Sequence, residues 1–242
     1  MHATTGRVCL AALLLGVCLP LVARAETPAK DANDPNSAPA APKVSFFTSD
    51  ANASHVIYVI DRSGSMAPTF PQVRHELLKS INKLNGDKQD FHILLFADNE
   101  YVEGPRKMLI RAEQKNKDAA GDFLKDITAS GATTVLPALK RAMTAMKYGD
   151  PRMAGRVIYL LSDGDFAGMS GGSTYTDKDG NSYRGNEAVI HWLRDNNPKQ
   201  DKNGRVKINT LLYLSQDEEA MKVMKTISEE SGGTFTLIKP EE

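Results

Sequence analysis

The chain has 242 residues, and its 30 Lys and Arg side chains balance 30 Asp and Glu, so the formal net charge is zero at neutral pH. A chain of this length can bury one sizeable hydrophobic core. The balanced charge provides no broad basic surface for nucleic acid or anionic lipid, so neither is expected as a partner.

Residues 1–25 have the layout of a secretory signal peptide. Arg7 precedes the apolar stretch VCLAALLLGVCLPLV, and the small residues of Ala-Arg-Ala end at Ala25. A membrane-spanning helix needs about 20 apolar residues, more than this stretch contains. Cleavage after Ala25 is therefore predicted, and an uncleaved membrane anchor is the alternative. Both cysteines, Cys9 and Cys18, would leave with the signal, so the mature chain would form neither a disulfide nor a thiolate metal site.

Residues 26–43, ETPAKDANDPNSAPAAPK, are rich in Ala, Pro and polar side chains. They contain almost nothing to bury, which is typical of a disordered or semi-extended linker. The globular domain is predicted to span residues 44–242, and no apolar run in it reaches membrane-spanning length. A secreted chain without cysteine fits a bacterial periplasm better than an animal matrix, so the predicted location is periplasmic or secreted.

Apolar runs and helical patterns alternate from residue 55 onward. Strands are predicted at 55–60, 91–97, 106–112, 156–162, 206–215 and 234–238. Helices are predicted after residue 69, where Val73, Leu77, Leu78, Ile81 and Leu84 share one face, and at 116–127, 134–146, 186–195 and 217–231. Capping boxes are predicted from Thr69 with Gln72 and from Ser215 with Glu218.

This alternation predicts the α/β fold class: a doubly wound, mostly parallel central sheet with helices on both faces. The strand at 106–112 has more polar content than the others and follows a short polar turn, DNEYVEGP. It is therefore placed near an edge, where it can run antiparallel. Residues 177–181, DKDGN, resemble a calcium loop, but Ser182 and Ala188 replace the glycine and glutamate that such a loop requires. A hairpin turn is predicted there instead.

Oxygen-bearing side chains follow the predicted strands at the points where ligands collect in a doubly wound sheet. Asp61, Ser63 and Ser65 occupy alternate positions after the strand at 55–60, and Gly64 helps the chain to bend. The segment SGATTV at 130–135 opens a helix, and Asp163 directly follows the strand at 156–162. Carboxylates and hydroxyls are hard donors that suit Mg²⁺, Mn²⁺ or Ca²⁺.

The segments DRSGSM, GATTVLPAL and LLSDGD, in this order, resemble the metal-ion-dependent adhesion site (MIDAS) of von Willebrand factor type A domains. The resemblance covers residues 44–242 and implies a Rossmann-like fold. It implies that Asp61, Ser63, Ser65, Thr133 and Asp163 hold a divalent cation, with Mg²⁺ as the first candidate. Thr134 remains the alternative to Thr133, and Asp163 can act through a water molecule. Ala132 departs from the family pattern, which often has glycine there.

The resemblance further implies a non-catalytic protein, in which the metal binds an Asp or Glu of a protein partner. Two alternatives stay open. A metal-dependent hydrolase would need a general base, for which Asp165 is the only spare acid near Asp163. A structural scaffold would use the metal only to tie loops together. The Gly-rich loop at 167–185 is expected beside the metal, where it would help to select the partner or form a plain solvent loop.

Overall fold

A computed structural model describes residues 2, 40–164, 166, 172–197 and 205–239. The strands are β1 (Lys43–Phe46), β2 (Ser49–Asn52), β3 (His55–Asp61), β4 (Asp90–Ala97), β5 (Glu100–Gly104), β6 (Ile110–Arg111), β7 (Arg156–Ser162), β8 (Thr174–Thr176), β9 (Ser182–Arg184), β10 (Lys207–Tyr213) and β11 (Phe235–Ile238). The helices are α1 (Phe70–Lys83), α2 (Gln114–Lys125), α3 (Leu136–Met146), α4 (Gly185–Asn196), α5 (Glu218–Ser231) and the 3-10 turn η1 (Gly64–Met66). The predicted signal peptide and most of the predicted linker lie outside the described residues.

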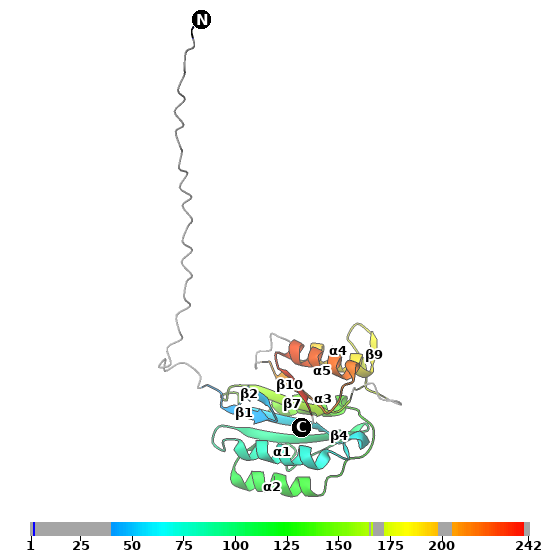
Figure 1. The fold of residues 1–242 in the computed structure, drawn as a ribbon. Coiled ribbons are helices and arrows are strands. Elements are labelled where there is room, and N and C mark those ends of the chain that lie inside the picture. The colour runs from blue at the N-terminus through cyan, green and yellow to red at the C-terminus, as the bar shows by residue number, and fades with distance from the viewer. Residues whose placement is uncertain (1, 3–39, 165, 167–171, 198–204, 240–242) are drawn as a thin grey trace. The chain divides into compact units, whose positions relative to one another are not determined.

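The central sheet has the strand order β11-β10-β7-β3-β4-β5, with β6 pairing to β4 as well (Figure 1). The strands from β11 to β4 run parallel, whereas β5 and β6 are antiparallel to β4. This is the predicted mostly parallel α/β sheet. The carboxyl ends of the adjacent strands β3, β4 and β7 meet at one edge, which positions the loops after them together.

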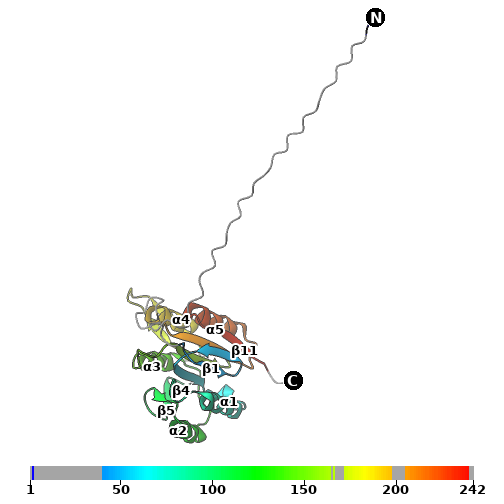
Figure 2. The same cartoon turned by 90° about the vertical axis from the view of Figure 1, so that its left-hand side faces the viewer.

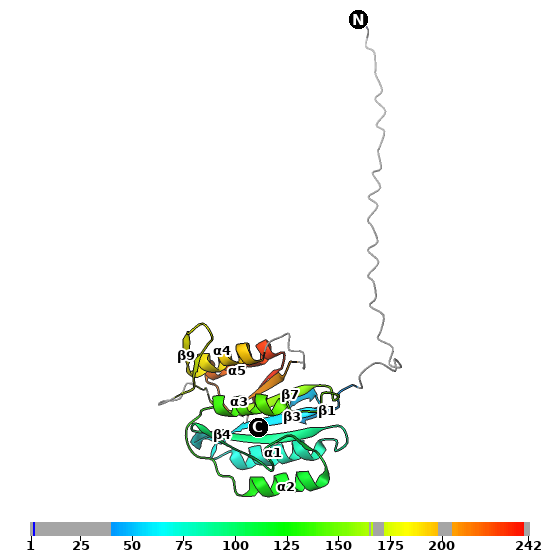
Figure 3. The ribbon, with the colours of Figure 1, turned by 180° about the vertical axis from the view of Figure 1, so that it is seen from behind.

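Helices cover both faces of the sheet, as expected. Figures 1 and 3 show α1 and α2 on one side and α3, α4 and α5 on the other. Strand β3 is buried along its whole length, and its side chains point alternately to the two faces of the sheet. Val56, Tyr58 and Ile60 pack in the core on the first face, and Ile57 and Val59 pack in the core on the second. A strand that is buried on both faces needs apolar residues at every position, which explains its continuous apolar run.

An N-terminal hairpin, β1–β2, fills the space beside α1 on the first face (Figure 2). Phe46 is fully buried, and its ring meets those of Tyr58 and Tyr159 edge-on at centroid distances of 5.4 and 5.7 Å. The Tyr159 hydroxyl donates to the Val44 carbonyl at 3.1 Å. The described residues therefore include a packed hairpin at 43–52, where the sequence pattern indicated no strand.

The prediction around 100–112 was wrong in detail. The segment interpreted as a turn contains strand β5, and the predicted strand at 106–112 shrinks to the two residues of β6. Strand β5 lies at the sheet edge and is mostly half-exposed, so it lacks the apolar run that marked β3 and β4. Its antiparallel course needs only a tight turn, in which Asp98 has a φ of 52°.

Both predicted capping boxes are also wrong. Thr69 has a helical backbone, and its hydroxyl donates to the Met66 carbonyl at 3.2 Å instead of capping α1. Helix α5 is capped by Asp217, whose carboxylate accepts from the Ala220 N–H at 2.6 Å. The predicted hairpin turn at 177–181 is confirmed, because β8 and β9 pair antiparallel across it.

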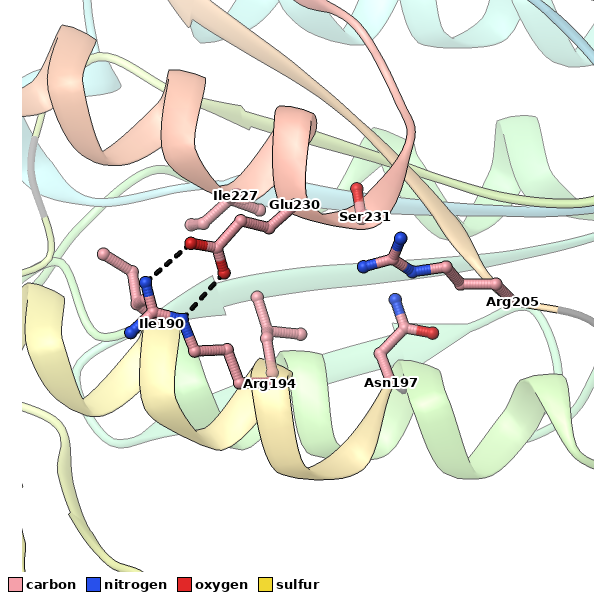
Figure 4. Close-up of a pocket in the computed structure, with 8 residues that line it drawn as sticks. Ile190, Arg194, Asn197, Arg205, Ile227, Glu230 and Ser231 are labelled. Carbon is pink, nitrogen blue, oxygen red and sulfur yellow. Dashed lines mark hydrogen bonds and ion pairs between the residues drawn. The ribbon is translucent and has the colours of Figure 1, made fainter. Parts of the chain in front are cut away.

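Helices α4 and α5 are joined at the surface by an ion pair. The Arg194 guanidinium donates to both carboxylate oxygens of Glu230, at 2.8 and 2.6 Å (Figure 4). The pair borders a cavity of about 310 Å³, whose apolar side includes Ile190, Leu193 and Ile227. Figure 4 shows the Arg205 side chain on the opposite side of this cavity.

Candidate metal centre

The first loop of the candidate site starts at the last residue of β3. Asp61 is fully buried, and its carboxylate accepts from the Ser63 N–H at 2.7 Å and from the Ser162 hydroxyl at 2.6 Å. Burial raises the pKa of Asp61 to about 6, although the hydrogen bonds from Ser162 and Ser63 oppose the shift. A buried carboxylate with a neighbouring acid, Asp163, is a position at which a cation would be strongly stabilised.

Hydrogen bonds continue from this loop to the loop after β7. The Ser63 and Ser65 hydroxyls lie 3.1 Å apart, and the Ser65 hydroxyl donates to the Asp163 carboxylate at 3.0 Å. The structure thus brings together four of the five predicted ligand residues, from segments about one hundred positions apart in the chain. Ser63 is buried, whereas Ser65 is exposed, so the group opens toward solvent on one side.

The second predicted segment, residues 130–135, lies against the first loop. The Ser130 N–H donates to the Arg62 carbonyl at 2.7 Å, and the Gly64 N–H donates to the Gly131 carbonyl at 2.9 Å. Thr133 is half-buried, two positions after Gly131. Among the described residues, no hydrogen bond joins its hydroxyl to the other four side chains. Thr134 is buried, and it stays the alternative donor.

Asp98 is a residue of the site region that the sequence reasoning missed. It clamps the 130–134 loop twice, because its carboxylate accepts from the Ala132 N–H at 2.8 Å and its own N–H donates to the Ala132 carbonyl at 2.6 Å. Gly131 has a φ of 91°, and a Cβ there would collide with the Asp98 carboxylate. The glycine that the backbone requires is therefore Gly131, which explains why the chain tolerates alanine at 132.

Ser162 was also missed, although it stands in the LLSDGD segment beside Asp163. It is the last residue of β7, fully buried, and its hydroxyl holds the Asp61 carboxylate. The sequence could have indicated this role, because Ser162 ends an apolar strand, and a serine buried there needs a hydrogen-bond partner. Ser162 acts on the site by orienting Asp61.

The donor set fits a hard divalent cation. Two carboxylates and up to three hydroxyls are oxygen ligands of the kind that Mg²⁺, Mn²⁺ and Ca²⁺ prefer. Within the described part of the chain, no three His, Cys, Asp or Glu side chains gather in an arrangement that could hold a metal ion. The candidate set differs from such clusters because hydroxyls supply most of its donors.

Comparison with known proteins shows what part of the chain resembles. Residues 56–166 match the model of the von Willebrand factor type A domain. This stretch contains all five predicted ligand residues. The chain is 31% identical over 117 residues to inter-alpha-trypsin inhibitor heavy chain H4 of Sus scrofa, and 28% identical over 117 residues to heavy chain H3 of Mesocricetus auratus. Each match covers 46% of this chain but only 12% and 13% of those relatives.

Solved structures share the type A fold. The pilus adhesin SpaC of Lactobacillus rhamnosus GG, in an open conformation, superposes with a TM-score of 0.59 at 16% identity, covering 79% of this chain and 28% of that one. A von Willebrand factor type A protein from Catenulispora acidiphila gives 0.56 at 16% identity, over 79% and 40%. Manganese-loaded TRAP of Plasmodium vivax gives 0.51 at 13% identity, over 77% and 68%. At these identities the likeness concerns the fold alone.

The described residues contain no helix with the length and apolarity needed to cross a membrane.

Proposed function

We propose that this protein is a metal-dependent interaction domain, in which a divalent cation, with Mg²⁺ as the first candidate, links it to an acidic group of a protein partner. The observation that supports this most strongly is the hydrogen-bonded continuity of Asp61, Ser63, Ser65 and Asp163 at one sheet edge. These side chains come from two loops that are far apart in the sequence, and they bring two hydroxyls and two carboxylates together.

The proposed ligands have separate roles. Asp61 and Asp163 would balance the charge of the cation, with Asp163 acting directly or through a water molecule. Ser63, Ser65 and Thr133 would supply neutral hydroxyls, which leave the ion short of negative charge. Such an ion binds a further anionic oxygen, and an Asp or Glu of the partner provides one. The manganese-loaded TRAP structure, which shares the fold, is consistent with a divalent cation at this type of domain.

The remaining organisation is part of the same proposal. Residues 1–25 would be removed as a signal peptide, and residues 26–43 would tether the domain in the periplasm or outside the cell. Intact-mass measurement of the protein recovered from a bacterial envelope tests this, because cleavage would leave Glu26 as the first residue. A retained Met1 would contradict it.

Calorimetry tests the metal. Mg²⁺, Mn²⁺ and Ca²⁺ are titrated into the wild-type protein, Asp61→Asn and the matched control Asp122→Asn. The Asp122 carboxylate is exposed on α2 and, among the described residues, forms an ion pair with Lys125. We expect saturable binding to the wild type and the control, and at least about tenfold weaker binding to Asp61→Asn. Equal affinities for all three would overturn the site. Turnover of an ester panel that is lost in Asp61→Asn would favour the hydrolase instead.

A further inference from the structure

A pocket adjoins the metal centre and is not explained by it. Its cavity volume is about 310 Å³, and it lies between the loop after β4, the start of α3 and the residues that lead into β8. Its polar lining comprises Asn99, Thr134, Lys140, Ser173 and Thr174. Thr134 directly follows the proposed ligand Thr133, so the pocket and the metal loops share one backbone segment.

The pocket lining carries a positive charge. Lys140 is its only charged lining residue within the described part of the chain, and it forms no ion pair there. Its ammonium group lies 6.0 Å from the centre of the Trp192 ring, a contact that leaves the positive charge available. The cavity between α4 and α5 differs, because the Arg194 charge beside it is already paired with Glu230 (Figure 4).

Two further features of the pocket favour an anion. Ser173 is 4% exposed, and its hydroxyl has no hydrogen-bond partner among the described residues, which is unusual for a buried polar group. Helix α3 starts after Val135 without a side-chain cap, so the positive end of its dipole is uncompensated next to Thr134. A hydroxyl donor, an ammonium group and a helix N-terminus together match a carboxylate.

The far wall of the pocket is held in place. The Gly185 N–H at the start of α4 donates to the Ser173 carbonyl at 2.8 Å. Beyond it, the Tyr183 ring of β9 stacks on the His191 ring of α4 at a centroid distance of 3.6 Å. The hairpin β8–β9 therefore presents Ser173 from a fixed position.

We propose that this pocket binds a second carboxylate of the partner, so that the recognised segment carries two acidic side chains, one at the metal and one at Lys140. This inference rests on the proposed function for its first contact. The second contact adds affinity because it is intramolecular once the first has formed. Lys140 and Ser173 then select di-acidic over mono-acidic partners.

The pocket is tested alone, without metal. Acetate is titrated in the presence of chelator while backbone amide NMR signals are followed. We expect saturable shifts at Thr134, Lys140 and Ser173, which weaken by roughly tenfold in Lys140→Gln and also weaken in Ser173→Ala. The matched control is Lys147→Gln, which removes the same charge just after α3. Equal acetate affinities in Lys140→Gln and Lys147→Gln would overturn the proposal.

The two contacts are then tested together with Mg²⁺ present. The probes are acetylated, amidated peptides with Asp at one end, a glycine spacer of increasing length, and Asp or Asn at the other. At one spacer length we expect the di-acidic peptide to bind roughly tenfold more tightly than its Asn counterpart, and Lys140→Gln to abolish only this difference. Mg²⁺-dependent binding with no effect of Lys140→Gln would refute the pocket alone. Acetate binding at the pocket, together with peptide binding that does not depend on Mg²⁺, would refute the proposed metal function alone.

Discussion

Ser162→Ala tests whether a buried hydrogen bond holds the Asp61 carboxylate. Both residues are fully buried, and the bond is 2.6 Å long. A hydrogen bond to a charged group contributes about 1.5–3 kcal/mol, more than the roughly 0.5–1.5 kcal/mol of a neutral one. Ser162→Ala should therefore lower the free energy of unfolding by about 1.5–3 kcal/mol. For a chain of this size the melting temperature should fall by roughly 3–12 °C.

Urea unfolding in the presence of chelator measures this without a contribution from metal. The matched control is Ser228→Ala, in which an equally buried hydroxyl donates to the neutral Lys225 carbonyl at 2.9 Å within α5. Alanine is the better helix former, so the control should change stability by less than about 1 kcal/mol. The m-value should stay constant in both variants. If Ser162→Ala changes stability no more than the control does, the bond does not support a charged Asp61, and the reasoning fails.

Two further predictions concern the clamp on the 130–134 loop and a buried histidine. Gly131→Ala should weaken Mg²⁺ binding by about tenfold in calorimetry, because the left-handed backbone strains alanine and the new Cβ displaces the Asp98 carboxylate. The control Gly121→Ala in α2, with open space around it, should bind Mg²⁺ like the wild type. Equal Mg²⁺ affinities for the two variants would contradict the clamp. Burial lowers the pKa of His92 below its usual 6.5, despite the opposing effect of Glu103, so the unfolded chain takes up the proton first as the pH falls below about 6.5. The stability advantage of the wild type over His92→Gln should therefore shrink between pH about 7.5 and about 5.5 in urea unfolding, and a constant difference would show that His92 titrates normally.

The local sequence pattern was sufficient to predict those strands that are buried on both faces. Strands β3, β4 and β7 are buried on both faces, so each reads as an unbroken apolar run with clear ends. The same pattern failed for β5, since an edge strand has one neighbour and keeps half-exposed polar residues. It also failed for the hairpin β1–β2, whose short strands are ordered by aromatic contacts with distant parts of the chain.

The residue that caps a helix was also difficult to predict from the sequence. The sequence offers several side chains that can cap a helix, and the backbone angles of the preceding loop decide which one does. At α5 Asp217 has the extended backbone that a cap needs, so it caps the helix in place of Ser215. At α1 the turn η1 places Thr69 in a helical conformation, which removes it as a cap.

The amino-acid sequence by itself determined the buried strands, the helices between them, the mostly parallel sheet and the three loops that carry oxygen donors, because hydrophobic periodicity and strand endings are local properties. Only the tertiary structure decided which side chains meet. It joined Asp61 to Ser162, Ser65 to Asp163 and Asp98 to the loop at 130–134, and it placed Lys140 and Ser173 around one pocket. Such contacts depend on which strands lie next to each other in the sheet, and no short window of sequence contains that information.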